Sequence, residues 1–418
     1  MHVSQYGIDD AGFNWDRYSR NQLTEKGFHP YYDMSLSLFD HFPPGTDLTI
    51  LKESEGEISP ESYPIDDGTI SQYVDDFLSG EDEGSTCYAD MISALKFKSS
   101  EGGLDYRIDL GRYVGASWEG VNSEPDSEGV YHYASQQCLY IDTFIDKANK
   151  DFQSLGQKTI KDYDTPALVN ESKRCDELDD TPGVFRDLAP SLVCALLYVA
   201  RSTRLDVLFP VCRMTRYIAA ARWMVRQDNW LYRCLGYLQK TSKMKLNYQI
   251  YPPDFEEGGD GIFEAWADAD LGGCALTKRS TSGGCCLLVG SKSRALVEAH
   301  CKRQGQAGIS TPESETVAMV VMGKKAIPLH MMAQRLLKRP VDLKYKGDNS
   351  ASERIIGTGI SQALTYLKRT AALSLTWAHE NMARWIGRTP TNENISDIFT
   401  KPLELEKLEK FRKLLGIY

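Results

Sequence analysis

Apolar and polar residues alternate with the two-residue period of a β-strand at several places between residues 258 and 418. The clearest case is "VDLKYKGDN" (341–349), whose apolar residues share one face and whose strand ends in Asp348. The stretches "FEAWADADLGG" (263–273) and "SGGCCLLVG" (282–290) predict two further strands, because both are apolar and end in glycine.

Helical spacing also occurs in this part of the chain. Thr311 can cap a helix, with Pro312 in the first helical position and acidic residues in the first turn. Near the end, four apolar residues recur at helical spacing after Pro402: Leu405, Leu408, Phe411 and Leu415. Because strands are mixed with helices, residues 258–418 predict an α/β (α+β) unit.

The pattern differs in the first 250 residues. Residues 6–28 have the spacing of a helix, with Gly27 as its stop. The stretch "TISQYVDDFLSG" (69–80) predicts a β-hairpin, and "LGRYVGASWEG" (110–120) predicts another strand. Residues 188–214 and the basic stretch after them predict helices, with breaks near two prolines. The stretch "YPPDFEEGGDG" (251–261) predicts a domain boundary, because prolines, glycines and acids gather there.

Composition narrows the class of protein. The chain has 418 residues, and 42% of them are hydrophobic, which is enough for packed cores. It has no apolar run long enough to span a membrane, and its N-terminus lacks the pattern of a secretory signal. None of the ten cysteines forms a C-x-x-C pair, so free thiols in a reducing compartment are expected. We therefore expect an intracellular protein, cytoplasmic or nuclear, with no membrane contact.

Charge is distributed unevenly. The net charge is −10, but residues 201–250 carry ten Lys or Arg against two Asp, which gives this window +8 and the rest −18. A basic segment within an acidic chain can follow a phosphate backbone, or it can be a solvated helix face. The charge alone leaves both interpretations open.

Four acidic residues are the candidates for chemistry. Asp268 lies in the first predicted strand, Glu315 near the start of a predicted helix, Asp348 at a strand end, and Asp397 before the last helix. Two Mg²⁺ ions held by such carboxylates can activate water and stabilise a leaving oxygen in phosphodiester hydrolysis. With 58 acids in the chain, an incidental arrangement stays possible on this ground alone. Asp270 is an alternative to Asp268, because alternate strand residues face one side.

Four motifs resemble the ribonuclease H domain of copia-type retrotransposons. They occur in the family's order: "WADADLGGCALTKRSTSGG" (266–284), "STPESETVAMV" (310–320), "KGDNSA" (346–351) and "ISDIFTKPL" (395–403). The last of them matches the family's A-D-I-F-T-K-P-L almost letter for letter. The resemblance implies that Asp268, Glu315, Asp348 and Asp397 are metal ligands and catalytic, with Mg²⁺ (or Mn²⁺) as cofactor and Glu315 also placing the attacking water.

The resemblance extends to the N-terminal part. "YVDD" (73–76) is similar to the palm motif of the reverse transcriptase that precedes this ribonuclease H, and "YGIDDAGFNW" (6–15) and "LLYVARSTRLDVLF" (196–209) resemble neighbouring segments. It implies a partial palm at 1–120, a thumb/connection region at 121–250 and a ribonuclease H-like mixed-sheet domain at 258–418. Asp75 would be a direct metal ligand and Asp76 a catalytic residue that supports it.

The match also departs from the family. A palm needs another metal-binding Asp on an earlier strand, and only five residues precede Tyr6, so we expect a truncated RNA-directed DNA polymerase that is inactive alone. Ala371 and Ala372 replace the family's Lys and His. His379 is interpreted as an exposed or hydrogen-bonded residue rather than a shifted family histidine.

The resemblance places the basic window in the thumb/connection region, which favours contact with an RNA/DNA hybrid. The expected contacts are Arg213, Arg216, Arg222, Arg226, Arg233 and Lys240. The aromatic residues among them, Trp223, Trp230 and Tyr232, are typical of a core, although they could stack on bases.

Together these observations predict a retrotransposon-derived Pol fragment that cleaves RNA in RNA/DNA hybrids. The alternative is a catalytically dead, nucleic-acid-binding remnant of a transposable element. An unrelated α/β hydrolase has no nucleophile-elbow motif to support it. Upstream Pol or Gag partners and the oligomeric state are left open.

Overall fold

The computed structural model describes most of the chain between residues 11 and 418. The described residues are 11–31, 35–43, 45–49, 66, 68–73, 76–81, 84–95, 112–113, 115–120, 123–169, 181–219, 222–274 and 277–418. The chain forms two compact units, Met1–Trp118 with Met331–Pro340, and Glu119–His330 with Val341–Tyr418. Among the described helices, none is long and apolar enough to cross a bilayer.

The first unit contains a four-stranded antiparallel sheet in the order β1-β2-β3-β4. Its elements are α1 (Ala11–Thr24), β1 (Phe28–Tyr31), β2 (Ser35–His41), β3 (Gly68–Tyr73), β4 (Asp76–Glu81) and α3 (Cys87–Leu95). The helix expected over 6–28 is confirmed from Ala11, and Gly27 follows it with a φ of 89°. Leu23, Phe28 and Phe39 are fully buried in the core of this unit.

The predicted hairpin around "YVDD" is confirmed in its pairing. Strands β3 and β4 are antiparallel, with Tyr73 opposite Asp76. Val74 and Asp75 lie outside the described residues, as does the side chain of Asp76. The metal-binding role expected for these two aspartates therefore stays a prediction. A short antiparallel pair, β5 (Arg112–Tyr113) and β6 (Ala116–Glu119), confirms the strand expected in 110–120.

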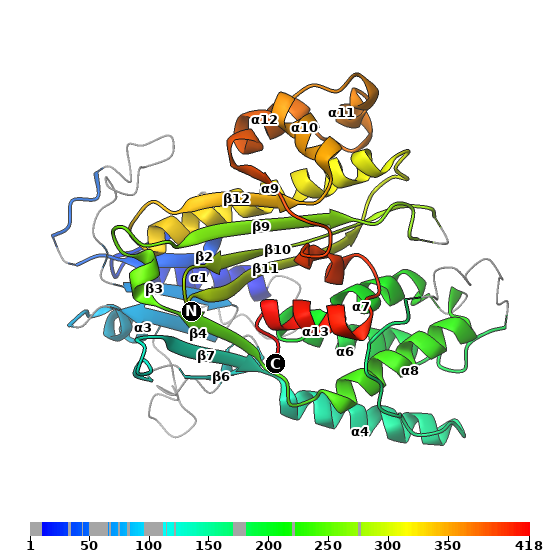
Figure 1. Ribbon diagram of the computed structural model, residues 1–418. Helices are drawn as coiled ribbons and strands as arrows, with labels where there is room; N and C mark the ends of the chain where they lie inside the picture. The colour runs from blue at the N-terminus through cyan, green and yellow to red at the C-terminus, as the bar shows by residue number, and fades with distance from the viewer. Residues whose placement is uncertain are drawn as a thin grey trace. The chain divides into compact units, whose positions relative to one another are not determined.

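Strands of the second unit follow the order β13-β12-β9-β10-β11-β8-β7 (Figure 1). They are β7 (Tyr131–Gln136), β8 (Leu246–Ile250), β9 (Ile262–Ala269), β10 (Thr281–Val289), β11 (Arg294–Arg303), β12 (Asp342–Gly347) and β13 (Ile386–Arg388). Strand β12 pairs in parallel with β9 and β13, whereas β9, β10 and β11 are antiparallel. The expected mixed α/β architecture is confirmed.

Helices surround this sheet. They are α4 (Cys138–Ser154), α6 (Ala189–Ser202), α7 (Leu208–Met214), α8 (Val225–Lys240), α9 (Thr311–Leu336), α10 (Ser350–Thr358), α11 (Leu367–Thr370), α12 (Leu375–Met382) and α13 (Leu405–Leu414). Short 3₁₀ helices lie between these elements: η2 (Leu205–Val207), η3 (Thr215–Tyr217), η5 (Pro252–Phe255), η6 (Gln362–Leu364), η7 (Ala383–Trp385) and η8 (Ile395–Phe399).

Two adjacent glycines of β10 show which elements cover the two faces of the sheet. A Cβ added to Gly283 would lie 2.6 Å from Cγ2 of Thr400, directly after η8. A Cβ added to Gly284 would lie 2.5 Å from Cγ of Met322 on α9. Because successive strand residues face opposite sides, η8 packs on one face and α9 on the other. Asp268 pairs with Gly283, so its side chain is on the η8 face.

The predicted start of α9 is correct to within one residue. The helix begins at Thr311, but Ser310 is the cap, because its Oγ accepts from the backbone N–H of Glu313 at 3.4 Å. The Glu313 carboxylate accepts from the N–H of Ile309 at 2.6 Å in return. This reciprocal pair satisfies two backbone donors at the helix start and fixes the direction in which α9 leaves the loop.

The boundary expected at 251–261 lies inside the second unit. The segment forms η5, and the buried Asp254 accepts the backbone N–H groups of Ser291, Lys292 and Ser293 at 2.8, 3.1 and 2.8 Å. These bonds tie the segment to the turn between β10 and β11, which is why proline and glycine do not mark a linker here.

Candidate metal centre

Three acidic side chains from three elements converge in the second unit. Asp268 lies near the end of β9, Glu315 on α9, and Asp348 directly after β12. One carboxylate oxygen of each lies within 4.8 Å of the others. Asp268 and Glu315 are buried, and Asp348 is half-buried. Among the described residues, this is the group of His, Cys, Asp or Glu side chains close enough to share one ion.

The electrostatics of the group favour a cation. Burial, followed by the charges of Asp268 and Asp348, raises the pKa of Glu315 to about 9. Burial also raises the pKa of Asp268 to about 6, although Lys401 lowers it. Like charges in a site with little water repel strongly, and they ionise together only when a cation is bound.

The donor set fits a hard divalent ion. Carboxylate oxygens are the ligands that Mg²⁺ and Mn²⁺ prefer, and a few of them suffice because the ion keeps several waters. One oxygen of Glu315, Oε2, accepts from the backbone N–H of Ala269 at 3.1 Å, which fixes the side chain beside β9. No described residue donates a hydrogen bond to Asp348, so its oxygens are available to a metal.

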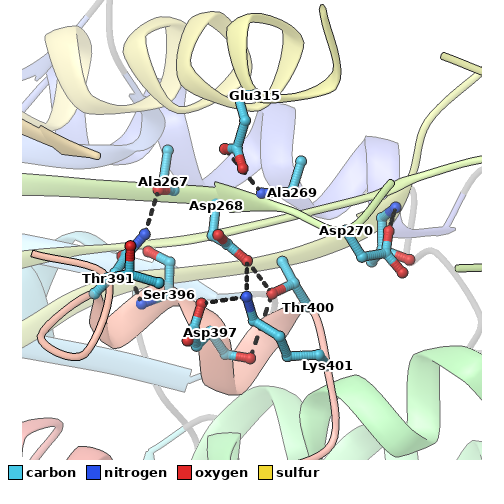
Figure 2. Close-up of polar contacts among 12 residues, drawn as sticks. Ala267, Asp268, Ala269, Asp270, Glu315, Thr391, Ser396, Asp397, Thr400 and Lys401 are labelled. Carbon is cyan, nitrogen blue, oxygen red and sulfur yellow. Dashed lines mark hydrogen bonds and ion pairs between the residues drawn. The ribbon is translucent and has the colours of Figure 1, made fainter. Parts of the chain in front are cut away.

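The fourth expected acid, Asp397, lies on η8 and is not in the group of three. Two ammonium groups contact it: Lys401 Nζ lies 2.7 Å from Oδ1, and Lys407 Nζ lies 2.5 Å from Oδ2. Lys401 Nζ also lies 3.4 Å from Oδ2 of Asp268, so it bridges the two aspartates (Figure 2). The Thr400 hydroxyl donates to the same Asp268 oxygen. Burial lowers the pKa of Lys401, but the two aspartates raise it further, and the net shift is upward.

Asp270 does not face the same side as Asp268, contrary to the expectation. Strand β9 ends at Ala269, so strand alternation no longer holds at the next residue. The Asp270 carboxylate accepts from the backbone N–H of Thr281, and its own N–H donates to the Thr281 carbonyl at 3.2 Å. Its side chain points away from the other acids (Figure 2). Asp268 is therefore the acid of "DAD" that belongs to the group.

The basic residues of the 201–250 window have different surroundings. Arg213 is buried, with its guanidinium 3.8 Å from the Trp230 ring centroid. Arg233 donates to Thr165 at 2.8 Å, and Lys240 forms an exposed ion pair with Asp164.

The other three basic residues of the set are exposed or half-buried. Arg222 is exposed and Arg226 half-buried, whereas Arg216 donates to Oγ1 of Thr281 at 3.0 Å. Trp223 and Trp230 are buried, which confirms the interpretation of these rings as core residues.

A basic groove of about 770 Å³ opens along β11, between this strand and helices α6 and α7. Five cationic side chains line it: Arg201, Arg216, Lys302, Arg303 and Lys325. Glu298 also lines it and pairs with Lys325 at 2.8 Å. Burial, with Lys325, Lys302 and Arg201, lowers the pKa of His300 to about 4, which is the effect expected of a positive potential.

One residue of the groove is aligned with Asp268 across three neighbouring strands of the sheet. Gly283 pairs with Asp268 on one side and with Cys301, a groove residue, on the other. Directly paired residues point to the same face, and two strand spacings are about 10 Å. Cys301 and Arg303 therefore face the side of the sheet that carries Asp268 and η8, whereas His300 and Lys302 face the α9 side, from which Lys325 also lines the groove.

Some residues of the site were not identified from the sequence. Lys401, Lys407 and Thr400 contact the acids, and two of them belong to the quoted motif "ISDIFTKPL". The motif places Lys401 four residues after Asp397, so the contact between the two could have been predicted from the sequence. His379 is exposed, and its Nδ1 bonds the carbonyl of Ile356 at 3.1 Å, which confirms the interpretation as a hydrogen-bonded surface histidine.

Comparison with known proteins shows a similarity to a transposon polyprotein. No protein-family model matches the chain. The chain is 25% identical over 367 residues to the retrovirus-related Pol polyprotein from transposon TNT 1-94 of Nicotiana tabacum. The match covers 83% of this chain and 24% of that polyprotein, so the chain spans about a quarter of its relative's length. Across most of its length, the chain is thus a distant relative of a retrotransposon Pol polyprotein.

Proposed function

We propose that the chain is the C-terminal part of a copia-type retrotransposon Pol polypeptide and that it cleaves RNA in RNA/DNA hybrids with Mg²⁺ or Mn²⁺. The observation that carries this proposal is the convergence of Asp268, Glu315 and Asp348 from β9, α9 and β12. The order of motifs and the similarity to a Pol polyprotein support it.

The three carboxylates would hold the cation, which, when bound, supplies a Lewis acid for phosphodiester hydrolysis. Glu315 is fixed at one oxygen by the N–H of Ala269, so its other oxygen can orient a water molecule. The Thr400 hydroxyl and Lys401 hold the Asp268 carboxylate in one orientation. Such fixed groups lower the cost of ordering reactants at the site.

The hybrid would reach this site along the basic groove. Arg216 and Arg303 lie at the end of the groove near Thr281, and Thr281 also bonds Asp270 directly after β9. A strand of phosphodiesters held there would pass close to the carboxylates. Contacts of this kind read the shape of the hybrid and the 2′-hydroxyl rather than base sequence.

The polymerase-like N-terminal part would be inactive alone. Besides Asp76, its described strands carry two acids, Asp40 on β2 and Glu81 at the end of β4, and Arg335 and Thr69 both contact the Asp40 carboxylate. An acid that is already paired is a poor ligand for a second catalytic ion. A primer-extension assay of the full chain should therefore show no DNA synthesis.

Cleavage of a hybrid with a labelled RNA strand tests the proposed nuclease. We expect cleavage with Mg²⁺, none with a chelator, and none for Asp348→Asn with Mg²⁺. Asp342→Asn is the matched control, because Asp342 is exposed at the other end of β12. Binding without cleavage by the unaltered protein would favour the alternative, a catalytically dead binding remnant.

A further inference from the structure

We propose that the Lys401 ammonium takes the place of a second divalent cation, so that the site binds a single metal ion. The inference rests on the proposed function, but it concerns the number of ions rather than the reaction. It changes the expectation of a two-ion site, since one of the four acids is neutralised by protein side chains.

The positions of the charges support this inference. Lys401 Nζ lies between Asp268 and Asp397, 3.4 and 2.7 Å from their nearest oxygens. An ion shared by these two aspartates would need the same space. The other oxygen of Asp397 is paired with Lys407 at 2.5 Å, so an ammonium group lies beside each oxygen of Asp397.

The backbone fixes Lys401 at this place. The N–H groups of Thr400 and Lys401 both donate to the Asp397 carbonyl, at 3.2 and 3.1 Å. The Thr400 hydroxyl donates to Asp268 from the same turn. The lysine side chain therefore leaves from a turn that is attached to both aspartates, which limits the positions its ammonium can reach.

The balance of charge gives the number of ions. Four carboxylates (Asp268, Glu315, Asp348 and Asp397) carry −4 when ionised, and Lys401 and Lys407 return +2. The remaining −2 matches one divalent cation held by Asp268, Glu315 and Asp348. Without nucleic acid bound, a second divalent ion would leave an excess of positive charge in a largely buried site, which is unfavourable.

Mn²⁺ binding to the full chain tests the inference, with calorimetry for the number of ions and electron paramagnetic resonance for their spacing. The unaltered protein should bind one Mn²⁺ with the spectrum of an isolated ion. Lys401→Met keeps the side chain's length but removes its charge, so it should bind two Mn²⁺ with a spin-coupled spectrum. Lys401→Arg keeps the charge and should bind one.

Lys407→Met is a matched control. It removes a charge from the same aspartate but leaves Lys401 between the two carboxylates, so one Mn²⁺ is expected. Thermal unfolding of each variant shows whether it is folded, and Lys401→Arg serves as the folded reference.

Each failure has a separate meaning. Two coupled ions in the unaltered protein, or one ion in Lys401→Met, would overturn the role of Lys401 and leave the proposed nuclease intact. No bound Mn²⁺ in the unaltered protein would overturn both the inference and the metal centre.

Discussion

Replacing Glu315 with glutamine should stabilise the metal-free protein at neutral pH. Burial and the neighbouring aspartates raise the pKa of Glu315 from 4.5 to about 9, so the folded protein holds a proton that the unfolded chain releases. Folding stability then falls as pH rises from about 4.5 towards 9, because the unfolded state binds fewer protons in that range.

The magnitude follows from the width of this window. Each pH unit within it changes the free energy of unfolding by about 1.4 kcal/mol. Between pH 5.5 and 7.5 the expected loss is therefore up to about 2.7 kcal/mol, and about 1–3 kcal/mol when the three acids share the proton. Glutamine has nearly the same shape and no charge, so the Glu315→Gln variant should lose most of this pH dependence.

Thermal unfolding followed by tryptophan fluorescence is a suitable assay, because five of the seven tryptophans (223, 230, 266, 377 and 385) lie in the second unit. Both proteins would be melted with a chelator at pH 5.5 and 7.5 and again with Mg²⁺. Mg²⁺ should raise the melting temperature of the unaltered protein more than that of the variant, because the ion binds the ionised carboxylate.

Glu380→Gln is the control, since Glu380 is exposed on α12 and should leave the pH dependence unchanged. Equal pH dependence in the unaltered protein and Glu315→Gln, with equal stabilisation by Mg²⁺, would refute the account of the site as repelling carboxylates.

Three further predictions concern other parts of the second unit. Arg204→Met should lower the free energy of unfolding by about 3–5 kcal/mol in chemical denaturation. The guanidinium donates two hydrogen bonds to the buried Asp206 carboxylate, at 3.1 and 2.8 Å, and the variant leaves that charge unpaired. The double variant with Asp206→Leu should be less destabilised, because it removes the unpaired charge. Reversing Lys302 and Arg303 to Glu should weaken hybrid binding and reduce its salt slope by about 2, with Mn²⁺ binding unchanged; an unaltered slope would count against the groove. Gly283→Ala should lower both melting temperature and Mn²⁺ affinity, since its Cβ would meet Thr400 at 2.6 Å, whereas Gly357→Ala points into open space and should lower neither.

The sequence predicts most of the sheet that carries the site. Strands β9, β10 and β12 have nearly uninterrupted or cleanly alternating apolar residues, and Asp348 ends its strand as expected. Strand β11 was missed, because "RALVEAHCKR" mixes charged and apolar residues. Its polar residues line the groove, so a strand that lies half in the core and half along the groove shows no simple period of apolar residues.

Tertiary contacts explain the remaining differences. Asp268 and Asp270 cannot be distinguished by spacing, since the end of β9 at Ala269 depends on the hydrogen bonds that Thr281 makes with Asp270. The basic window carries a charge that the sequence shows, but the burial of Arg213 against Trp230 depends on helix packing. The local sequence pattern thus predicts the helices and strands, whereas tertiary packing determines which charged side chains are buried or paired.

The late position of η8 in the chain has a consequence for biosynthesis. Residues 395–401 bring Phe399 and Thr400 against Gly283, and Thr400 and Lys401 against Asp268, although they follow Asp268 by more than a hundred residues. While the ribosome is still adding this segment, the face of the sheet at Asp268 is bare and lacks its positive counter-charge. A growing chain therefore completes this centre only after residue 401 has been added, so the acids of the sheet are made before the groups that hold them in place.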